Sequence, residues 1–317
     1  MADVIKCATR DAYGAALKQL GTRDDILVLD ADLAKATKTI TFKKEFPEKF
    51  IDCGIAEGNM MGVAAGLATT GYTVFASSFA MFAAGRAFEQ VRNSIAYPNL
   101  NVKIGATHAG ISVGEDGASH QCCEDIALMR SIPNMVIINP ADDVEAIAAV
   151  HAAVDHEGPV YMRFGRLAVP RINSEDYKFE LGKGVLLKDG KDVTIVASGL
   201  MVNEALIAAE TLAAEGIDAR VINIHTIKPI DKDILVAAAK ETGAIVTAEE
   251  HSIIGGLGSA VSEALAEEYP VPVVKLGVND TFGKSGPALE LLKIFGLDAE
   301  NIVVKAKKAI ELKNKLA

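Results

Sequence analysis

Short apolar runs alternate with longer amphipathic stretches along the first 165 residues of the chain. Apolar runs of this length, rich in β-branched residues, are typical of strands in a parallel sheet. The stretches between them repeat apolar residues at helical spacing, so we expect helices that connect the strands and cover both faces of the sheet. The predicted strands are 26–30, 73–76, 101–107, 135–139 and 160–164, and the predicted helices are 8–20, 58–69, 80–96, 122–130 and 141–155.

The pattern is interrupted at residues 165–190, which are polar and have no helical period. Alternation then resumes and continues to the end of the chain. We therefore predict an α/β protein of two domains, each a mostly parallel sheet flanked by helices. The predicted boundaries are 1–166 for the first domain, 167–190 for a linker and 191–317 for the second domain. Its predicted strands are 192–198, 218–224, 243–250 and 271–277, and its predicted helices are 201–215, 231–240, 255–268 and a closing group from about 286.

A single acidic residue, Glu57, stands before a long uncharged stretch. No charged side chain occurs in the 28 residues from Gly58 to Gly85. A carboxylate in apolar surroundings is costly to ionise and normally has a partner, yet the preceding "DCGIA" offers no cation. Interaction with a helix start would contribute only about 0.5 kcal/mol. Asn59, the glycines and the "TTGY" turn disfavour a membrane span, so we expect this stretch to be buried core.

Two features of this stretch allow more than one interpretation. Glycines recur at every fourth position from 58 to 66. Such a stripe lets a second backbone or a flat ligand approach closely, although tight helix packing would explain it equally well. Phe75, Phe79 and Phe82 fall on one side of a helical projection, a pattern that is more often part of a core than a cofactor platform.

The stretch "THAGISVGEDGASHQCCED" (107–125) follows a predicted strand and is too polar and too long for a simple connection. Long loops at the carboxyl ends of parallel strands are where open α/β sheets bind ligands. His108, Glu115, Asp116 and His120 are its candidate functional residues. A zinc site and an inert surface loop are the alternatives; the zinc site would draw on His108, His120, Cys122 and Cys123, although adjacent cysteines rarely bind one tetrahedral ion.

Composition limits the classes of function. The chain has 317 residues and a net charge of −10, which argues against a nucleic-acid-binding protein because such proteins normally present a basic face. The N-terminal "MADVIKCATRD" lacks the apolar core of a signal peptide, and four cysteines, two of them adjacent, suggest reduced thiols. We therefore expect a cytoplasmic protein. The glycine-rich stretches 253–261 and 278–285 do not match the spacing of a dinucleotide fingerprint or a phosphate loop.

Several longer motifs occur in a fixed order along the two predicted domains. In the first domain they are "CGIAEGNMMGVAAGLA", "FASSFAMF", "GEDGASHQ" and "RSIPNMVIINPAD"; in the second they are "HTIKPID", "TAEEHSIIGGLGSAV" and "NDTFGKSGPALELLKIFGL". Taken together, these motifs resemble the transketolase family. The resemblance implies a pyrimidine-binding domain followed by a transketolase C-terminal domain. The Gly-Asp-Gly motif with which full-length members bind the diphosphate and its Mg²⁺ does not occur in this chain. The chain is thus similar to the C-terminal half of a split transketolase, and we expect it to need an N-terminal-half partner. By analogy with the family, we expect the assembly to be α2β2.

The resemblance implies thiamine diphosphate as the cofactor, with Mg²⁺ held mainly by the partner subunit. Glu57 stands where the family's glutamate contacts the pyrimidine ring and activates the cofactor by favouring its imino tautomer. Phe79 and Phe82 would form the apolar wall for that ring, and Asp32 would face the thiazolium side. The cofactor would then carry a two-carbon ketol unit from a ketose phosphate to an aldose phosphate.

The resemblance also implies the sugar contacts. His120 and His108 would hydrogen-bond the substrates and help to move protons, a role suited to imidazole. Asp116 would bind a sugar hydroxyl. Arg10 and Arg166 match the family's phosphate-binding arginines, whose planar guanidinium suits a phosphate.

Some positions depart from the family pattern. Ala36 stands where a phosphate-contacting serine is usual, and Thr37 is the residue that could compensate. Gly85 replaces an aromatic residue, and "GRAFEQV" resembles 1-deoxy-D-xylulose-5-phosphate synthase. The alternatives are therefore another thiamine diphosphate enzyme, either of that kind or the β subunit of a 2-oxo acid dehydrogenase, and a non-catalytic α/β partner protein.

Overall fold

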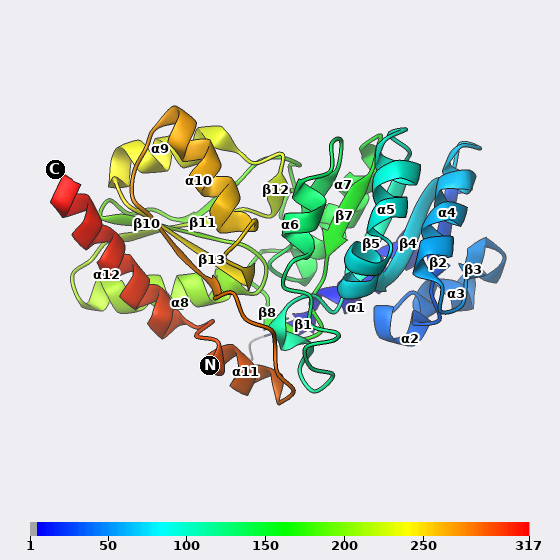
Figure 1. Cartoon of the computed structure of the whole chain (residues 1–317), viewed down its shortest axis with the longest axis horizontal. Helices are drawn as coiled ribbons and strands as arrows, with labels where there is room; N and C mark the ends of the chain where they lie inside the picture. The colour runs from blue at the N-terminus through cyan, green and yellow to red at the C-terminus, as the bar shows by residue number, and fades with distance from the viewer. Residues whose placement is uncertain (1–4, 317) are drawn as a thin grey trace.

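The computed structural model describes residues 5–316, which form two lobes side by side, each built on its own sheet (Figure 1). The first sheet has seven strands in the order β12-β6-β7-β5-β4-β2-β3, all parallel except β12. The second has five strands in the order β14-β13-β10-β11-β9, all parallel except β9. The predicted fold class, two mostly parallel sheets flanked by helices, is confirmed.

The elements of the first lobe match most of the predicted ones. The predicted helix 80–96 is present but is made largely of the wider π-type turns of η2 and η3. The short elements α2, α3 and β3 and the small β1–β8 sheet were not predicted. The elements are β1 (Lys6–Ala8), α1 (Thr9–Leu20), β2 (Ile26–Asp30), α2 (Ala34–Thr37), α3 (Ile40–Glu45), η1 (Pro47–Lys49), β3 (Phe50–Asp52), α4 (Glu57–Ala68), β4 (Thr73–Phe79), η2 (Met81–Arg86), α5 (Phe88–Gln90), η3 (Val91–Ala96), β5 (Val102–Thr107), η4 (Ile111–Val113), α6 (Asp125–Arg130), β6 (Val136–Ile138), α7 (Asp143–Asp155), β7 (Val160–Arg163) and β8 (Ala168–Pro170).

The second half of the chain follows the predicted alternation, except that β9 lies within the predicted linker 167–190 and β12 was not predicted. Helix α9 has clear sequence signals at both ends. Asp231 caps the start of α9 by accepting a hydrogen bond from the Ile234 amide, and Gly243 ends that helix in the left-handed conformation that glycine adopts without strain. The elements are β9 (Val185–Lys188), β10 (Val193–Ala197), α8 (Met201–Ala214), β11 (Ala219–Asn223), β12 (Thr226–Lys228), α9 (Lys232–Thr242), β13 (Ile245–Ser252), α10 (Leu257–Glu268), β14 (Val273–Val278), α11 (Ala288–Ile294) and α12 (Ala299–Leu316).

Helices cover both faces of the first sheet, as expected for parallel strands joined by helical crossovers. In Figure 1 α4, α5 and α6 lie in front of the strands, and α1 lies behind them. Phe75 belongs to the core beneath α1, 6.4 Å from the ring of Tyr13. The interpretation of Phe75, Phe79 and Phe82 as one side of a helix is therefore wrong, because Phe75 and Phe79 lie in strand β4.

The lobes are joined by more than the connecting chain. Strand β12, from the second half of the sequence, pairs with β6 and so extends the first sheet. The buried guanidinium of Arg163 contacts Asp125 at 2.9 Å and donates to the backbone oxygen of Glu250 at 2.8 Å, which ties the first sheet to the end of β13. The loop after β5 also lies against the second lobe, because the Ser112 amide donates to the Glu250 carboxylate.

The adjacent cysteines face two different cores. Cys122 packs in the core that includes α4 and α6, whereas Cys123 packs with side chains of the second lobe. All four cysteines are free thiols. Within residues 5–316 no group of three or more His, Cys, Asp and Glu side chains is placed to hold a metal ion, so the zinc alternative finds no site there.

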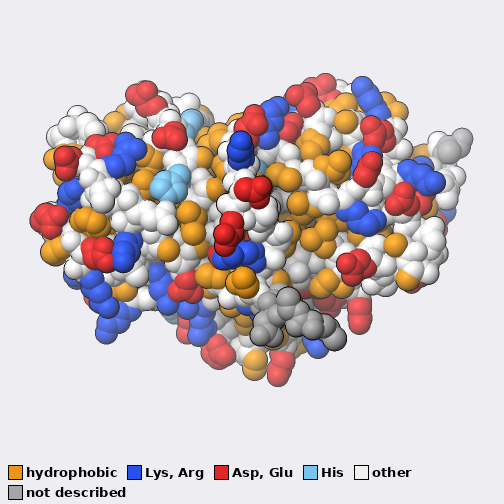
Figure 2. Space-filling model, turned by 180° about the vertical axis from the view of Figure 1, so that it is seen from behind, with side chains coloured by type: hydrophobic (Ala, Val, Ile, Leu, Met, Phe, Trp, Pro, Cys, Tyr) orange, Lys and Arg blue, Asp and Glu red, His pale blue; other side chains and the backbone are white. Residues whose placement is uncertain are grey.

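The outer surface mixes charges of both signs. Seen from behind, Lys and Arg side chains alternate with Asp and Glu over both lobes, with apolar side chains between them (Figure 2). No helix within residues 5–316 is long and apolar enough to span a membrane. The uncharged stretch 58–85 forms helix α4, strand β4 and part of η2 instead.

Candidate active site

The candidate residues lie at the carboxyl ends of five neighbouring strands, in the order β7-β5-β4-β2-β3. The chain after β3 leads to Glu57, the chain after β2 to Asp32, and β4 ends at Phe79. His108 follows β5, and Arg166 lies three residues beyond β7. Because parallel strands end at the same edge of a sheet, residues far apart in sequence meet there.

Glu57 is 2% exposed and begins helix α4. Arg86, at the end of η2, donates through Nη1 to both carboxylate oxygens at 3.0 Å. Glu57 therefore has a partner within this chain, although the residues just before it offer no cation. Arg86 was missed although it is the first charged residue after the uncharged stretch, because a pair separated by 29 positions has no local sequence signal.

Two phenylalanines and two histidines gather beside this ion pair. Phe79 and Phe82 stack with their ring centres 5.8 Å apart. His108 stacks on Phe79 at 3.8 Å, and His120 meets the Phe82 ring edge-on at 5.3 Å. The guanidinium of Arg86 lies 4.6 Å from the centre of the Phe82 ring, which connects this aromatic group to Glu57. Four predicted residues from three segments thus form one cluster.

His108 is held in one tautomer. Arg10 Nη1 can only donate, so at 2.8 Å His108 Nε2 accepts, and the proton is on Nδ1, which donates to Thr107 Oγ1 at 2.9 Å. Burial, followed by the charges of Arg10 and Arg166, lowers the pKa of His108 to about 3. The imidazole is therefore neutral at physiological pH, with both ring nitrogens engaged by the protein.

Arg10, at the start of α1, links His108 to the turn after β2. Its Nη1 also donates to the Ala36 backbone oxygen at 3.2 Å. Lys38, which sequence reasoning missed, is a further positive charge that lowers the pKa of His108. Thr37 is fully buried and donates to Asp30 Oδ2 at 2.7 Å, so it does not offer a hydroxyl in place of the serine absent at position 36. The expectation that Thr37 compensates is wrong.

The remaining candidates lie at the rim. Arg166 is half-exposed, donates to the Val113 backbone oxygen and pairs with Glu115 at 3.1 Å. Asp116 is exposed at the tip of the same loop. Asp32, also exposed, adopts a φ of 63° in the turn after β2 and lines a separate hollow of about 390 Å³ together with Lys35, Ala36, Lys43, Asp52 and neighbouring apolar residues.

The glycines of α4 differ in their surroundings. A side chain at Gly58 would lie 3.2 Å from Gln90 Oε1, whereas Gly62 and Gly66 are exposed and have no described atom within 4 Å of the position of a Cβ atom. Packing within the chain therefore does not explain these two glycines. A side chain at Gly85 would meet only the flexible end of Met81.

Comparison with known proteins assigns the family. The family model "Transketolase, pyrimidine binding domain" matches residues 5–171, and "Transketolase, C-terminal domain" matches residues 182–302. The chain belongs to the transketolase family. Membership implies thiamine diphosphate as the cofactor, and the alternative thiamine diphosphate enzymes are not favoured.

This transketolase chain corresponds to the C-terminal half of the longer family members. It is 42% identical to human transketolase over 94% of its own length but covers only 48% of that protein. It is 54% identical to a protein of Methanocaldococcus jannaschii described as a transketolase C-terminal section, with 92% of this chain and 93% of that protein covered. A solved structure described as a split-gene transketolase in an inactive β4 tetramer matches with a TM-score of 0.91 and 60% identity, over 96% of this chain and 99% of that one.

Proposed function

We propose that this chain supplies the pyrimidine side of a transketolase active site and transfers a two-carbon ketol unit from a ketose phosphate to an aldose phosphate. The observation that carries the proposal is the buried Glu57 carboxylate at the start of α4, beside the stacked rings of Phe79 and Phe82. An acid in this position fits a ligand with a ring nitrogen and an apolar face.

The residues present fit the pyrimidine half of thiamine diphosphate. Glu57 would hold a ring nitrogen, and Phe82 and Phe79 would provide the apolar wall. When bound, the cofactor supplies the nucleophilic carbon that accepts the ketol unit. The exposed Arg86 would leave Glu57 to make room, which its 55% exposure permits. Mg²⁺ and the diphosphate would be held mainly by the partner subunit, and Asp32 would lie toward the thiazolium side.

The two histidines suit different tasks. Both nitrogens of His108 are occupied by Arg10 and Thr107, its low pKa keeps it neutral, and the residue is only 3% exposed. His108 would therefore act on the substrate mainly by orienting Arg10. His120 is half-exposed and uses Nδ1 toward Ser119 Oγ at 3.0 Å. Its Nε2 is therefore the better group to hydrogen-bond a substrate oxygen and move a proton.

Positive charge gathers where a substrate phosphate would bind. Arg10 and Arg166, with Lys38 nearby, are close enough to His108 to lower its pKa together. Arginine suits bidentate contact with a phosphate, and the Lys38 charge would offset the missing serine at position 36. Asp116, exposed on the same loop, would bind a sugar hydroxyl.

We further propose an N-terminal-half partner subunit, an α2β2 assembly and a cytoplasmic location. The similarity to a split-gene transketolase whose β chains alone are described as inactive supports the need for a partner. The exposed Gly62 and Gly66 on α4 leave room for another chain. The four free cysteines are consistent with a reducing compartment.

The decisive experiment mixes this chain with its N-terminal-half partner, thiamine diphosphate and Mg²⁺, and measures ketol transfer from xylulose 5-phosphate to ribose 5-phosphate. We expect activity from the mixture only, and loss of it in Glu57→Ala. Glu89→Ala, an exposed acid on α5, is the matched control and should stay active. Full activity of Glu57→Ala would refute the assigned role, and activity of the isolated chain would refute the need for a partner.

A further inference from the structure

The second lobe holds the loop that carries His108, Asp116 and His120 (residues 108–121). The first contact between the loop and the second lobe is at the end of β13, where Glu250 is 4% exposed. Its Oε1 accepts a hydrogen bond from the Ser112 amide at 2.5 Å. Gly110 lies so close that a Cβ atom there would be 2.3 Å from the Glu250 carboxyl carbon. The first part of the loop therefore rests directly on the second lobe.

The second contact is made by Gln121, which lies at the end of the loop and is 4% exposed. Its amide nitrogen donates to the backbone oxygens of Ile111 at 3.1 Å and Gly114 at 3.2 Å, which closes the loop on itself. The same nitrogen donates to the Lys284 backbone oxygen at 2.9 Å. Because an amide NH₂ group has two hydrogens for these three acceptors, its donor capacity is fully used. Gln121 therefore acts on the loop and on the second lobe, and has no donor left for a substrate.

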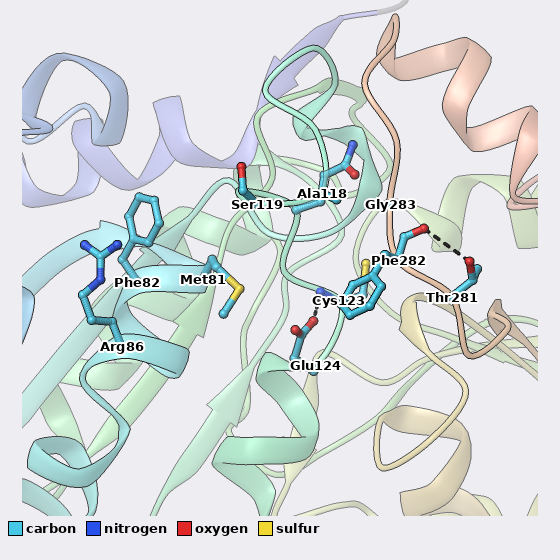
Figure 3. A pocket seen from close by; sticks show the side chains of 11 residues that line it. Met81, Phe82, Arg86, Ala118, Ser119, Cys123, Glu124, Thr281, Phe282 and Gly283 are labelled. Carbon is cyan, nitrogen blue, oxygen red and sulfur yellow. Dashed lines mark hydrogen bonds between the residues drawn. The ribbon is translucent and has the colours of Figure 1, made fainter.

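Two glycines allow the close approach at this contact. A Cβ atom at Gly283 would lie 1.7 Å from Gln121 Oε1, and one at Gly117 would lie 2.3 Å from Ser285 Oγ. In Figure 3 the chain at Gly283 lies beside the loop that carries Ala118 and Ser119. Met81 and Phe82 stand on the opposite wall of this pocket, whose volume is about 390 Å³. The segment 283–285 thus lies directly against the loop, across the pocket from Met81 and Phe82.

We infer that Gln121 is a positioning residue through which segment 283–285 of the second lobe sets the working shape of the sugar-binding loop. The second lobe would then take part in substrate recognition through the Lys284 backbone oxygen, which binds Gln121. The inference rests on the proposed function, because it assumes that Asp116 and His120 contact the sugar. A loop that carries two such groups loses substrate contacts when it shifts by about an ångström, a displacement that can reduce rates by about 100-fold.

The test uses Gln121→Met, which keeps the side-chain length and removes both donors. In the complex with the partner subunit, we expect the KM for the ketose phosphate to rise about tenfold or more, with cofactor affinity unchanged. In the chain without partner, trypsin should cleave faster after Lys284, whose backbone is released, while cleavage after the exposed Lys178 stays the same. Unchanged cleavage at Lys284 would overturn the inference, as would faster cleavage with an unchanged KM.

A second variant separates positioning from loss of folding. Gly283→Ala should also raise the KM, because its methyl group would displace Gln121, and the combination with the shorter Gln121→Ser should be no worse than Gln121→Ser alone. Gly286→Ala is the matched control, since its methyl group would only touch Leu291 at 3.3 Å. Additive effects in the double variant would contradict the contact. A wild-type complex without ketol transfer would instead refute the proposed function.

Discussion

The contact between Arg86 and Glu57 makes a prediction that concerns the cofactor site directly. A ring nitrogen that binds the Glu57 carboxyl must compete with Arg86, which donates to both oxygens at 3.0 Å. Replacing Arg86 by Met keeps an aliphatic chain over Phe82 and removes the competing cation. We therefore expect Arg86→Met to bind thiamine diphosphate more tightly than the wild type, once both are assembled with the partner subunit.

The magnitude follows from the exposure of the two groups. Glu57 is buried, but the Arg86 side chain is 55% exposed, so the pair is worth far less than the ~3–5 kcal/mol lost on breaking a fully buried one. Exposed pairs contribute ~0.2–1 kcal/mol, and a cation over an aromatic ring at an exposed site adds ~0.5–1 kcal/mol. Taking ~1 kcal/mol for the interaction that the cofactor must displace gives an affinity gain of about fivefold.

Isothermal titration of the assembled enzyme with thiamine diphosphate and Mg²⁺ measures this gain. In the chain without partner the same substitution should lower the free energy of unfolding by ~1 kcal/mol, because Glu57 loses its partner. Arg92→Met is the matched control, since Arg92 is exposed on the next turn of helix and contacts Asn93 instead. An equal or weaker cofactor affinity in Arg86→Met would show that Arg86 does not compete with the pyrimidine ring for Glu57.

Three further predictions concern stability, pH and the phosphate. Burial lowers the pKa of Lys103 to about 7, so between pH 7 and the unfolded-state value of ~10.5 the unfolded chain binds more protons than the folded one. The free energy of unfolding of the wild type should therefore rise by ~2 kcal/mol relative to that of Lys103→Met from pH 7 to 9. The same stability difference between the two proteins at both pH values, measured by urea denaturation, would contradict this. Arg163→Met leaves buried Asp125 without its cation and should lower the free energy of unfolding by ~3–5 kcal/mol; a loss below 1 kcal/mol in urea denaturation would argue against a tight pair. Ala36→Ser should lower the KM of phosphorylated sugars about threefold or more through one new hydrogen bond, and an equal change for unphosphorylated sugars would place Ala36 away from the phosphate.

The regular elements could be predicted because periodicity reports local geometry. The strands predicted at 26–30 and 192–198 are present as β2 and β10. Strand β12 could not be found in this way, because only three residues form it and its partner β6 lies in the other half of the sequence. The π-helical geometry of η2 and η3 could not be predicted either. Over six residues, the spacing of apolar residues does not distinguish an α-helix from a π-helix.

Candidate site residues could be named from the sequence, but the contacts that they make within the chain could not. The position of Glu57 before an uncharged stretch drew attention to it, yet its contact with Arg86 depends on how η2 folds back over α4. Thr37 illustrates the same limit. One position away from Ala36, its hydroxyl turns inward to Asp30, whereas the Ala36 backbone oxygen faces Arg10. Sequence adjacency therefore says little about which of two neighbours reaches a site.

Two ion pairs of this chain differ in the solvent exposure of the cation. This exposure decides whether the buried carboxylate can exchange its partner. Asp125 and Arg163 are both buried, at 0% and 3% exposure, so neither can leave without stranding the other away from water. Glu57 is equally buried, but Arg86 can turn into solvent with its charge hydrated. The second arrangement is the one that our proposal requires, because Glu57 would need a partner before the cofactor binds and would have to release it afterwards. The exposure of the cation, more than the burial of the acid, is thus what supports our proposal that Glu57 binds the cofactor.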